Sequence, residues 1–227
     1  WGTLHPLYGE RKRTTMSRIA AILPAAGLGT RMGADTPKQF LDLDGMPLVI
    51  FTLRRLASCS AITEFLIATR AEEVPSLAER VAQEQIGRSV RVVRGGGSRQ
   101  ESVANAFAEV DPSTEIVLVH DAVRPFVTRE QTERVIAEAR ARGAAILGIP
   151  AMDTVKEVKR ARLPVVSEAE PPEDVALITA TIPRERIVLA QTPQAFQYSL
   201  LKEAFAKAAE DGSTGSDEAS LVERLGH

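Results

Sequence analysis

The chain has 227 residues, 28 Lys and Arg against 30 Asp and Glu, and a formal net charge of -2. With 44% hydrophobic and 26% charged residues its composition is that of a globular protein, which excludes wholesale disorder. The balanced charge argues against a dedicated nucleic-acid or membrane-surface binder. A single cysteine, Cys59, excludes an internal disulfide and a cysteine-built zinc site. We therefore expect a cytoplasmic enzyme or binding domain.

The N-terminal residues 1–15 lack the hydrophobic stretch of a signal peptide. Met16 directly precedes the first apolar segment, so we expect it to be the native start. Residues 1–15 are then a non-native or disordered extension, with a short native tail as the alternative. Residues 16–227 are expected to form a single domain.

From residue 19, short apolar runs alternate with helix-like segments. Strands are predicted over 19–23, 62–68, 90–93, 116–119 and 144–149. Helices are predicted over 48–56, 76–85 and 200–209, and again after residue 216. Another helix is predicted to begin at Ser98, which has capping-box spacing to Glu101, and a further one to begin at Thr128 and end at Gly143. This alternation predicts an α/β fold, with a mostly parallel sheet and helices on both faces.

The alternation breaks between residues 153 and 184. Two extended pieces, 154–158 and 176–182, flank a polar stretch that contains Pro171 and Pro172. This pattern predicts a projecting β-arm instead of another strand–helix unit.

Glycines follow the first and third predicted strands, at residues 24–33 and 95–102. The first loop carries Arg31, and Lys38 lies just beyond it. Its spacing fits neither the dinucleotide fingerprint nor the Walker loop. Glycine backbone N–H groups approach anions closely, and two nearby cations suit a polyphosphate. A structural turn with two solvated cations is the alternative.

A third loop, with Asp121 and Arg124, follows the strand predicted over 116–119. Because the carboxyl ends of parallel strands meet at one edge of a sheet, we expect the three loops to converge there. Spacing alone predicts a polyphosphate-binding α/β domain.

Six motifs, in order along the chain, give a more specific indication. The segments 24–33, 37–40, 120–125, 153–154, 191–194 and 216–220 resemble the 2-C-methyl-D-erythritol 4-phosphate cytidylyltransferase family. The resemblance implies a Rossmann-like nucleotidyltransferase fold and a homodimer that exchanges its β-arms. It also implies a magnesium-dependent reaction of CTP with methylerythritol phosphate in non-mevalonate isoprenoid biosynthesis. The substrate phosphate would attack the α-phosphate of CTP in line, giving CDP-methylerythritol and pyrophosphate.

The resemblance also implies roles for individual residues. Arg31, Lys38 and Arg184 would be catalytic. CTP would be bound by Pro24, Ala25, Ala26, Gly27, Gly96, Ser102 and Ala122. The polyol phosphate would be bound by Asp121, Arg124, Thr154, Arg184 and Asp217. Asp121 is also the candidate magnesium ligand, with the triphosphate as the alternative holder of the metal.

Two departures from the family pattern bear on these roles. The arm over residues 153–184 is longer than the pattern implies, so the match of Arg184 is local. The family's closing strand and helix, with a second substrate-positioning lysine, are missing after residue 227. We expect either a truncated sequence or a defective form.

Two other functions are considered. Ribitol-5-phosphate cytidylyltransferases share similar motifs but typically show Ala-Gly-Gly where this chain has Ala25, Ala26 and Gly27. A non-catalytic CTP-binding module is the second alternative, motivated by the missing C-terminal segment.

Overall fold

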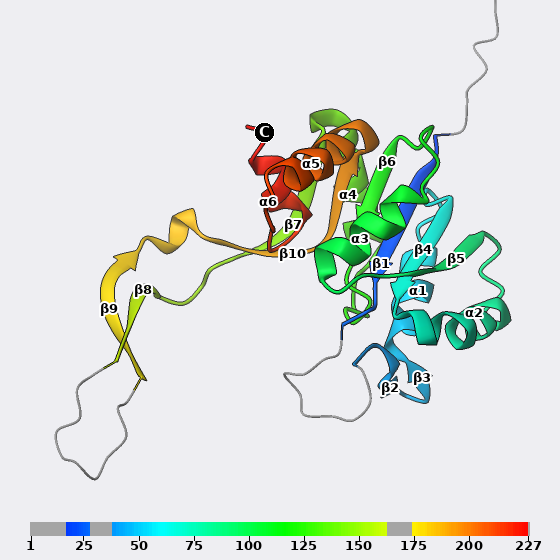
Figure 1. Cartoon of the computed structure of the whole chain (residues 1–227), viewed down its shortest axis with the longest axis horizontal. Coiled ribbons are helices and arrows are strands. Elements are labelled where there is room, and N and C mark those ends of the chain that lie inside the picture. Colours follow the sequence, from blue (N-terminus) through cyan, green and yellow to red (C-terminus); the bar gives the residue numbers. More distant parts are fainter. Residues whose placement is uncertain (1–16, 28–37, 163–173, 227) are drawn as a thin grey trace, which may run out of the picture.

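A computed structural model describes residues 17–27, 38–162 and 174–226, and its centre is a six-stranded sheet (Figure 1). Its strands, in spatial order, are β5 (Ser89–Arg94), β4 (Glu64–Thr69), β1 (Ile19–Pro24), β6 (Ile116–Val119), β10 (Val188–Gln197) and β7 (Ala144–Pro150). The first four strands pair in parallel, whereas β10 runs antiparallel to both β6 and β7. The predicted mostly parallel α/β sheet is confirmed.

Helices cover both faces of the sheet. One face packs against α1 (Leu48–Ala57), α2 (Val74–Gln83) and α4 (Arg129–Arg142), and the other against α3 (Arg99–Ala108), α5 (Tyr198–Glu210) and α6 (Glu218–Glu223). In β1, Ile19, Ala21 and Leu23 face the first layer while Ala20 and Ile22 face the second. All five are fully buried, which explains why this strand is continuously apolar.

The helix ends follow the sequence signals with one difference. Thr128 and Gln131 form the full capping box of α4, and Gly143 ends this helix at φ 94°, a conformation that favours glycine. At α3, the Ser98 hydroxyl accepts the backbone N–H of Glu101. The carboxylate of Glu101, however, accepts the N–H of Gly97 at 2.8 Å. The capping box expected there is therefore only half formed.

Two features were absent from the sequence prediction. Strand β10 contains Gln191, Thr192, Pro193 and Gln194, a polar segment that interrupts the apolar pattern of a strand, and its register with β7 shifts there. A short hairpin of β2 (Asp42–Leu43) and β3 (Met46–Pro47) follows the 3-10 turn η2 (Lys38–Phe40).

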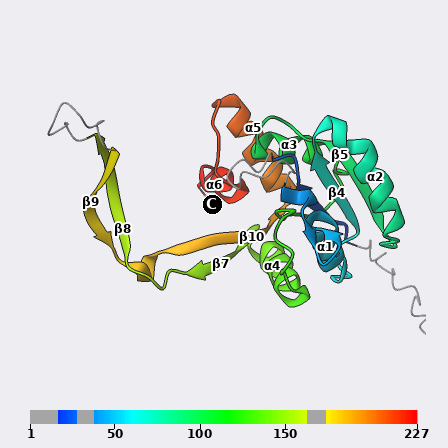
Figure 2. The ribbon, with the colours of Figure 1, turned by 90° about the horizontal axis from the view of Figure 1, so that it is seen from below.

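The predicted arm is confirmed as a two-stranded antiparallel hairpin that projects from the ends of β7 and β10 (Figures 1 and 2). It consists of β8 (Val155–Arg162) and β9 (Asp174–Ile182), with Val155 opposite Ile182 at its base. A 3-10 turn, η4 (Arg184–Arg186), leads back to β10. Residues 163–173 lie outside the described residues.

The expectation for residues 1–15 also falls outside the part of the chain that the structure describes. Within that part, the helices are too short or too polar to cross a lipid bilayer.

Thr128→Ala tests how the start of α4 is stabilised. Loss of the cap should lower the free energy of unfolding by about 1 kcal/mol. Urea denaturation measures this change, with Thr214→Ala as a matched control because Thr214 is exposed in the loop after α5. Equal stabilities of the two variants would contradict the capping role.

Candidate active site

A cavity of about 630 Å³ opens at the carboxyl ends of β1, β4, β5 and β6. The cavity lies at this edge because the four strands are parallel, so that the small or charged residues that follow each strand meet there. The lining residues are Pro24, Ala25, Ala26, Gly27, Lys38, Gln39, Arg70, Gly96, Gly97, Ser98, Arg99, Ser102, Asp121 and Val123.

Most of the residues that the sequence predicted for CTP surround this cavity. They come from the end of β1 and the residues after it (Pro24, Ala25, Ala26 and Gly27), and from the turn before α3 and its first turn (Gly96 and Ser102). Ala122 is buried beside the cavity, and its carbonyl oxygen accepts the Thr52 hydroxyl at 2.8 Å. The fold therefore brings two distant glycine-rich segments together, while their contacts with a nucleotide stay predictions.

The segment between β5 and α3 is held by its own hydrogen bonds. The Ser102 hydroxyl accepts the Gly96 N–H at 3.0 Å and donates to the Ser98 carbonyl at 2.8 Å. A Cβ at Gly96 would overlap the Glu101 side chain, so the close approach of this loop to the helix requires glycine there. Contacts within the chain therefore hold this wall of the cavity.

Alternating charges form a second wall. The Asp121 carboxylate accepts Nε of Arg99 at 3.1 Å and Nε of Arg124 at 2.9 Å. Nη1 of Arg99 reaches both oxygens of Glu218 at 2.9 Å. Arg124 also donates to the side-chain oxygen of Gln191. Three elements far apart in sequence meet in this row: the start of α3, the loop after β6 and the start of α6. We call it the charged wall (Arg124, Asp121, Arg99 and Glu218).

Burial and pairing shift the pKa values in the charged wall. Burial raises the pKa of Asp121, but Arg99 and Arg124 outweigh it and hold this pKa below its ordinary value. Burial lowers the pKa of Arg99, but Glu218 and Asp121 outweigh it and raise this pKa. For Glu218, burial is the larger effect and raises its pKa. Arg99 therefore stays charged between two acids.

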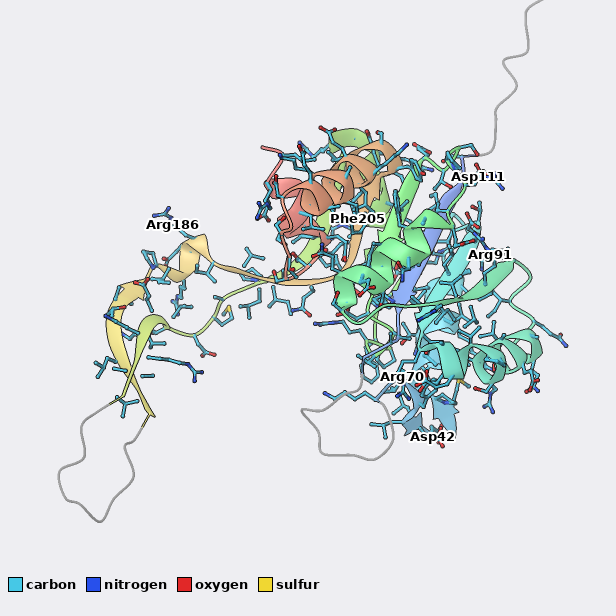
Figure 3. The ribbon with its side chains drawn as sticks, viewed as in Figure 1. Asp42, Arg70, Arg91, Asp111, Arg186 and Phe205 are labelled. Atoms are coloured by element: carbon cyan, nitrogen blue, oxygen red, sulfur yellow. The ribbon has the colours of Figure 1, made fainter. Side chains whose placement is uncertain are left out.

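Three further side chains line the cavity near the glycine loop. Lys38 lies on η2, as predicted for a loop cation. Arg70, at the end of β4 (Figure 3), is paired with Glu73, whose other oxygen accepts the Thr69 hydroxyl at 2.7 Å. Gln39 is buried, and its side-chain nitrogen has no hydrogen-bond partner among the described residues. Lys38 and Arg70 place positive charge at this end of the cavity.

Several predicted site residues do not line the cavity of the same chain. Thr154 and Arg184 lie on the arm, where Nη1 of Arg184 donates to the Met152 carbonyl at 2.7 Å. The Asp217 carboxylate caps α6 through the Ser220 N–H at 3.0 Å and accepts the Gln194 amide at 2.6 Å. Arg31 lies outside the described residues.

The described residues do not build a magnesium site of their own. They contain no group of three or more His, Cys, Asp or Glu side chains placed to hold a metal. Within the same ranges, Asp121, the predicted ligand, is the one carboxylate lining the cavity, and both its oxygens are paired with arginines.

Sequence reasoning missed Arg70, Gln39, Arg99 and Glu218. Arg99 and Glu218 stand inside motifs that were recognised, over 95–102 and 216–220, but were given no role. Their pairing joins positions 119 residues apart, and no local pattern predicts such a contact. Arg70 follows directly after a buried strand, so its position at the edge of the sheet was the available signal.

Known proteins resemble this chain in both sequence and structure. The family model described as "IspD: 2-C-methyl-D-erythritol 4-phosphate cytidylyltransferase" matches residues 19–227. Relatives of that name from Acidobacterium capsulatum and Solibacter usitatus are 49% and 48% identical, over 92% of this chain and 85% and 84% of theirs. The structure of the Thermus thermophilus protein of that name aligns with a TM-score of 0.69 at 33% identity, covering 92% of this chain and 85% of that one.

A further similar structure, called 4-diphosphocytidyl-2C-methyl-D-erythritol synthase, comes from Anaerococcus prevotii. It aligns with a TM-score of 0.75 at 25% identity and covers 93% of this chain and 84% of that one. This chain is therefore similar, in both its sequence and its fold, to proteins that are named as cytidylyltransferases or synthases of the same compound.

His120, at the end of β6, generates a pH prediction. Burial lowers its pKa, although Nε2 lies 3.0 Å from the Arg124 carbonyl oxygen. In the unfolded chain His120 binds a proton near pH 6.5, whereas in the folded protein it stays neutral at that pH. The free energy of unfolding therefore decreases as the pH falls below about 6.5.

Urea denaturation between pH 7.5 and 5.5 should show this loss, with a slope up to about 1.4 kcal/mol per pH unit steeper than in His120→Gln. His5 and His227 are present in both proteins, so the difference in slope isolates His120. Identical slopes would contradict a depressed pKa.

Proposed function

The chain belongs to the 2-C-methyl-D-erythritol 4-phosphate cytidylyltransferase family, and we propose that the cavity at the strand ends is its catalytic site. The activity that family membership gives is transfer of the cytidylyl group of CTP to methylerythritol phosphate in isoprenoid biosynthesis. The observation that carries the placement is the convergence of two glycine-rich segments, Lys38, Arg70 and Arg99 on one cavity.

The reaction requires no protein nucleophile. A phosphate oxygen of the polyol phosphate attacks the α-phosphorus of CTP, and the bond to the bridging oxygen breaks to release pyrophosphate. The barrier falls when two anions are held together and the developing negative charge is neutralised in a site prepared beforehand. Cations placed at the cavity supply that neutralisation, which is why an overall balanced charge suffices.

Each wall of the cavity is proposed to hold one part of CTP. The small residues after β1 and the segment with Gly96 and Ser102 would accommodate the nucleoside, because their backbone groups are accessible without bulky side chains. Lys38, with Arg31 from the neighbouring loop, would stabilise the triphosphate during transfer. Magnesium would arrive with CTP as part of the substrate. Because the cytoplasm supplies both CTP and magnesium, we propose that the enzyme works there.

The acceptor side of the site is proposed to come from a second copy of the chain. Thr154, directly before β8, and Arg184, the first residue of η4, belong to the arm and do not line the cavity of their own chain. The arm projects away from the central sheet (Figure 2). Large apolar side chains of the arm and its base are exposed, with Met152 at 77% and Ile178 at 66%. Exchange of arms in a homodimer would bury these side chains and bring Arg184 to the partner's cavity, where it can position the acceptor phosphate.

The two alternatives make different demands on the same site. A ribitol-phosphate enzyme would share the CTP half of the cavity and differ in the acceptor half. The relatives and structures reported above carry the methylerythritol-phosphate name, which favours that acceptor. A non-catalytic module would bind CTP without releasing pyrophosphate. Comparison of pyrophosphate release with methylerythritol phosphate and with ribitol phosphate separates the three.

Lys38→Ala tests the catalytic placement of this cation. Removal of one group that stabilises the transition state should lower kcat by about 100-fold or more, with little change in stability. Pyrophosphate release measures kcat, and Lys202→Ala on the exposed face of α5 serves as the control. A near-normal kcat for Lys38→Ala would exclude the role.

Complementation tests the shared site. Lys38→Ala and Arg184→Ala chains, co-expressed with different tags, should form mixed dimers in which one of the two sites has an intact cavity and an intact partner arm. With random pairing about half of the dimers are mixed, and each mixed dimer has one intact site of two. The mixture should therefore show about a quarter of the wild-type activity. Lys38→Ala paired with Asp121→Asn is the matched control, since no intact cavity can form. Activity no higher than that of the separate variants would contradict the exchange of arms.

A further inference from the structure

One member of the charged wall is a carboxylate for which no role was expected. Glu218, the first residue of α6, is 1% exposed. Both its oxygens accept Nη1 of Arg99 at 2.9 Å. Of these two residues, Arg99 lines the cavity. Glu218 therefore contacts the cavity through Arg99 and not directly.

Arg99 is restrained at two of its nitrogens. Nη1 contacts Glu218, while Nε donates to Oδ1 of Asp121 at 3.1 Å. A guanidinium is planar and its N–H groups have fixed directions, so two such contacts fix both its position and the orientation of its plane. Arg99 in turn fixes one oxygen of Asp121, and Arg124 fixes the other.

The start of α6, which carries Glu218, is bound to β10. Gln194 of β10 donates to Asp217 at 2.6 Å and accepts the Ala219 N–H at 3.2 Å, on either side of Glu218. Leu221 and Val222 of α6 are buried against the sheet. Helix α6 is thus held to β10, with its first side chain against Arg99.

We propose that Glu218 is a positioning residue for cytidylyl transfer, and that it holds Arg99 against Asp121 in the one arrangement that the nucleotide meets. The inference rests on the proposed function. Without the Glu218 charge, Arg99 keeps one acidic partner and is free to turn toward the triphosphate. The cavity would then bind CTP against a displaced guanidinium and a less constrained Asp121.

A double-mutant cycle of Glu218→Gln and Arg99→Met tests the proposal. Glu218→Gln keeps the size of the side chain and removes its charge, and kcat/KM for CTP should fall about 10- to 100-fold, as for other residues that orient a contacting group. Because Glu218 acts through Arg99, the double variant should be no slower than Arg99→Met alone. Glu223→Gln, at an exposed position of the same helix, should stay within about twofold of wild type.

A purely structural role of Glu218 predicts a different result. Displacement of α6 would then lower kcat/KM independently of Arg99, and the double variant would show the product of the two single effects. The melting temperature of each variant is measured as well, to detect a loss of stability. The double variant removes both charges of the buried pair, which proteins tolerate better than the loss of one, so it remains informative if Glu218→Gln is poorly stable.

Multiplicative effects, or a kcat/KM of Glu218→Gln within twofold of wild type, would overturn the proposal. If the wild type released no pyrophosphate, the proposed function would fail separately. The same cycle read as CTP affinity by calorimetry would then decide on Glu218, with non-additive losses supporting it and additive or absent losses contradicting it.

Discussion

The parallel pairing of β5, β4, β1 and β6 is the constraint on which the rest of the molecule depends. Four carboxyl ends are brought to one edge, and with them Gly27, Arg70, Gly96 and Asp121. Because β1 packs on both faces, a shift by one residue would exchange Ile19, Ala21 and Leu23 with the smaller set on the other face and would mispack both layers. The register of β1 against β4 and β6 therefore also fixes the shape of the cavity.

Charge in this protein acts by placement. The chain is nearly neutral, yet cations gather where four strands end, and two of them, Arg70 and Arg99, are oriented by acidic neighbours. Glu73 holds Arg70, and Asp121 with Glu218 holds Arg99. Buried ion pairs gain little net stability, since desolvation of the charges offsets their attraction. Their value in the proposed reaction lies in prepared geometry, since a polyphosphate would then bind without reorganisation of the site.

Local signals predicted much of the fold. The uninterrupted apolar run at 116–119 corresponds to β6, and the Thr128 cap and Gly143 bound α4 as expected. Strand β10 escaped prediction because its polar Gln191–Gln194 stretch has no strand pattern; the paired strands beside it hold it in the sheet. For the site, strand-end glycines and Asp121 were predictable from position. The link from Arg99 to Glu218 was not, because it depends on how α6 folds back against α3. Arg31 stays a prediction.

We propose that this cavity transfers the cytidylyl group of CTP to methylerythritol phosphate. Phosphorus NMR of the wild-type protein with CTP, magnesium and methylerythritol phosphate tests it most directly. We predict that the CTP resonances are replaced by those of free pyrophosphate and of a new diphosphate diester, and that neither forms without the acceptor. Unchanged CTP in the complete mixture, or faster conversion with ribitol phosphate, would contradict the account.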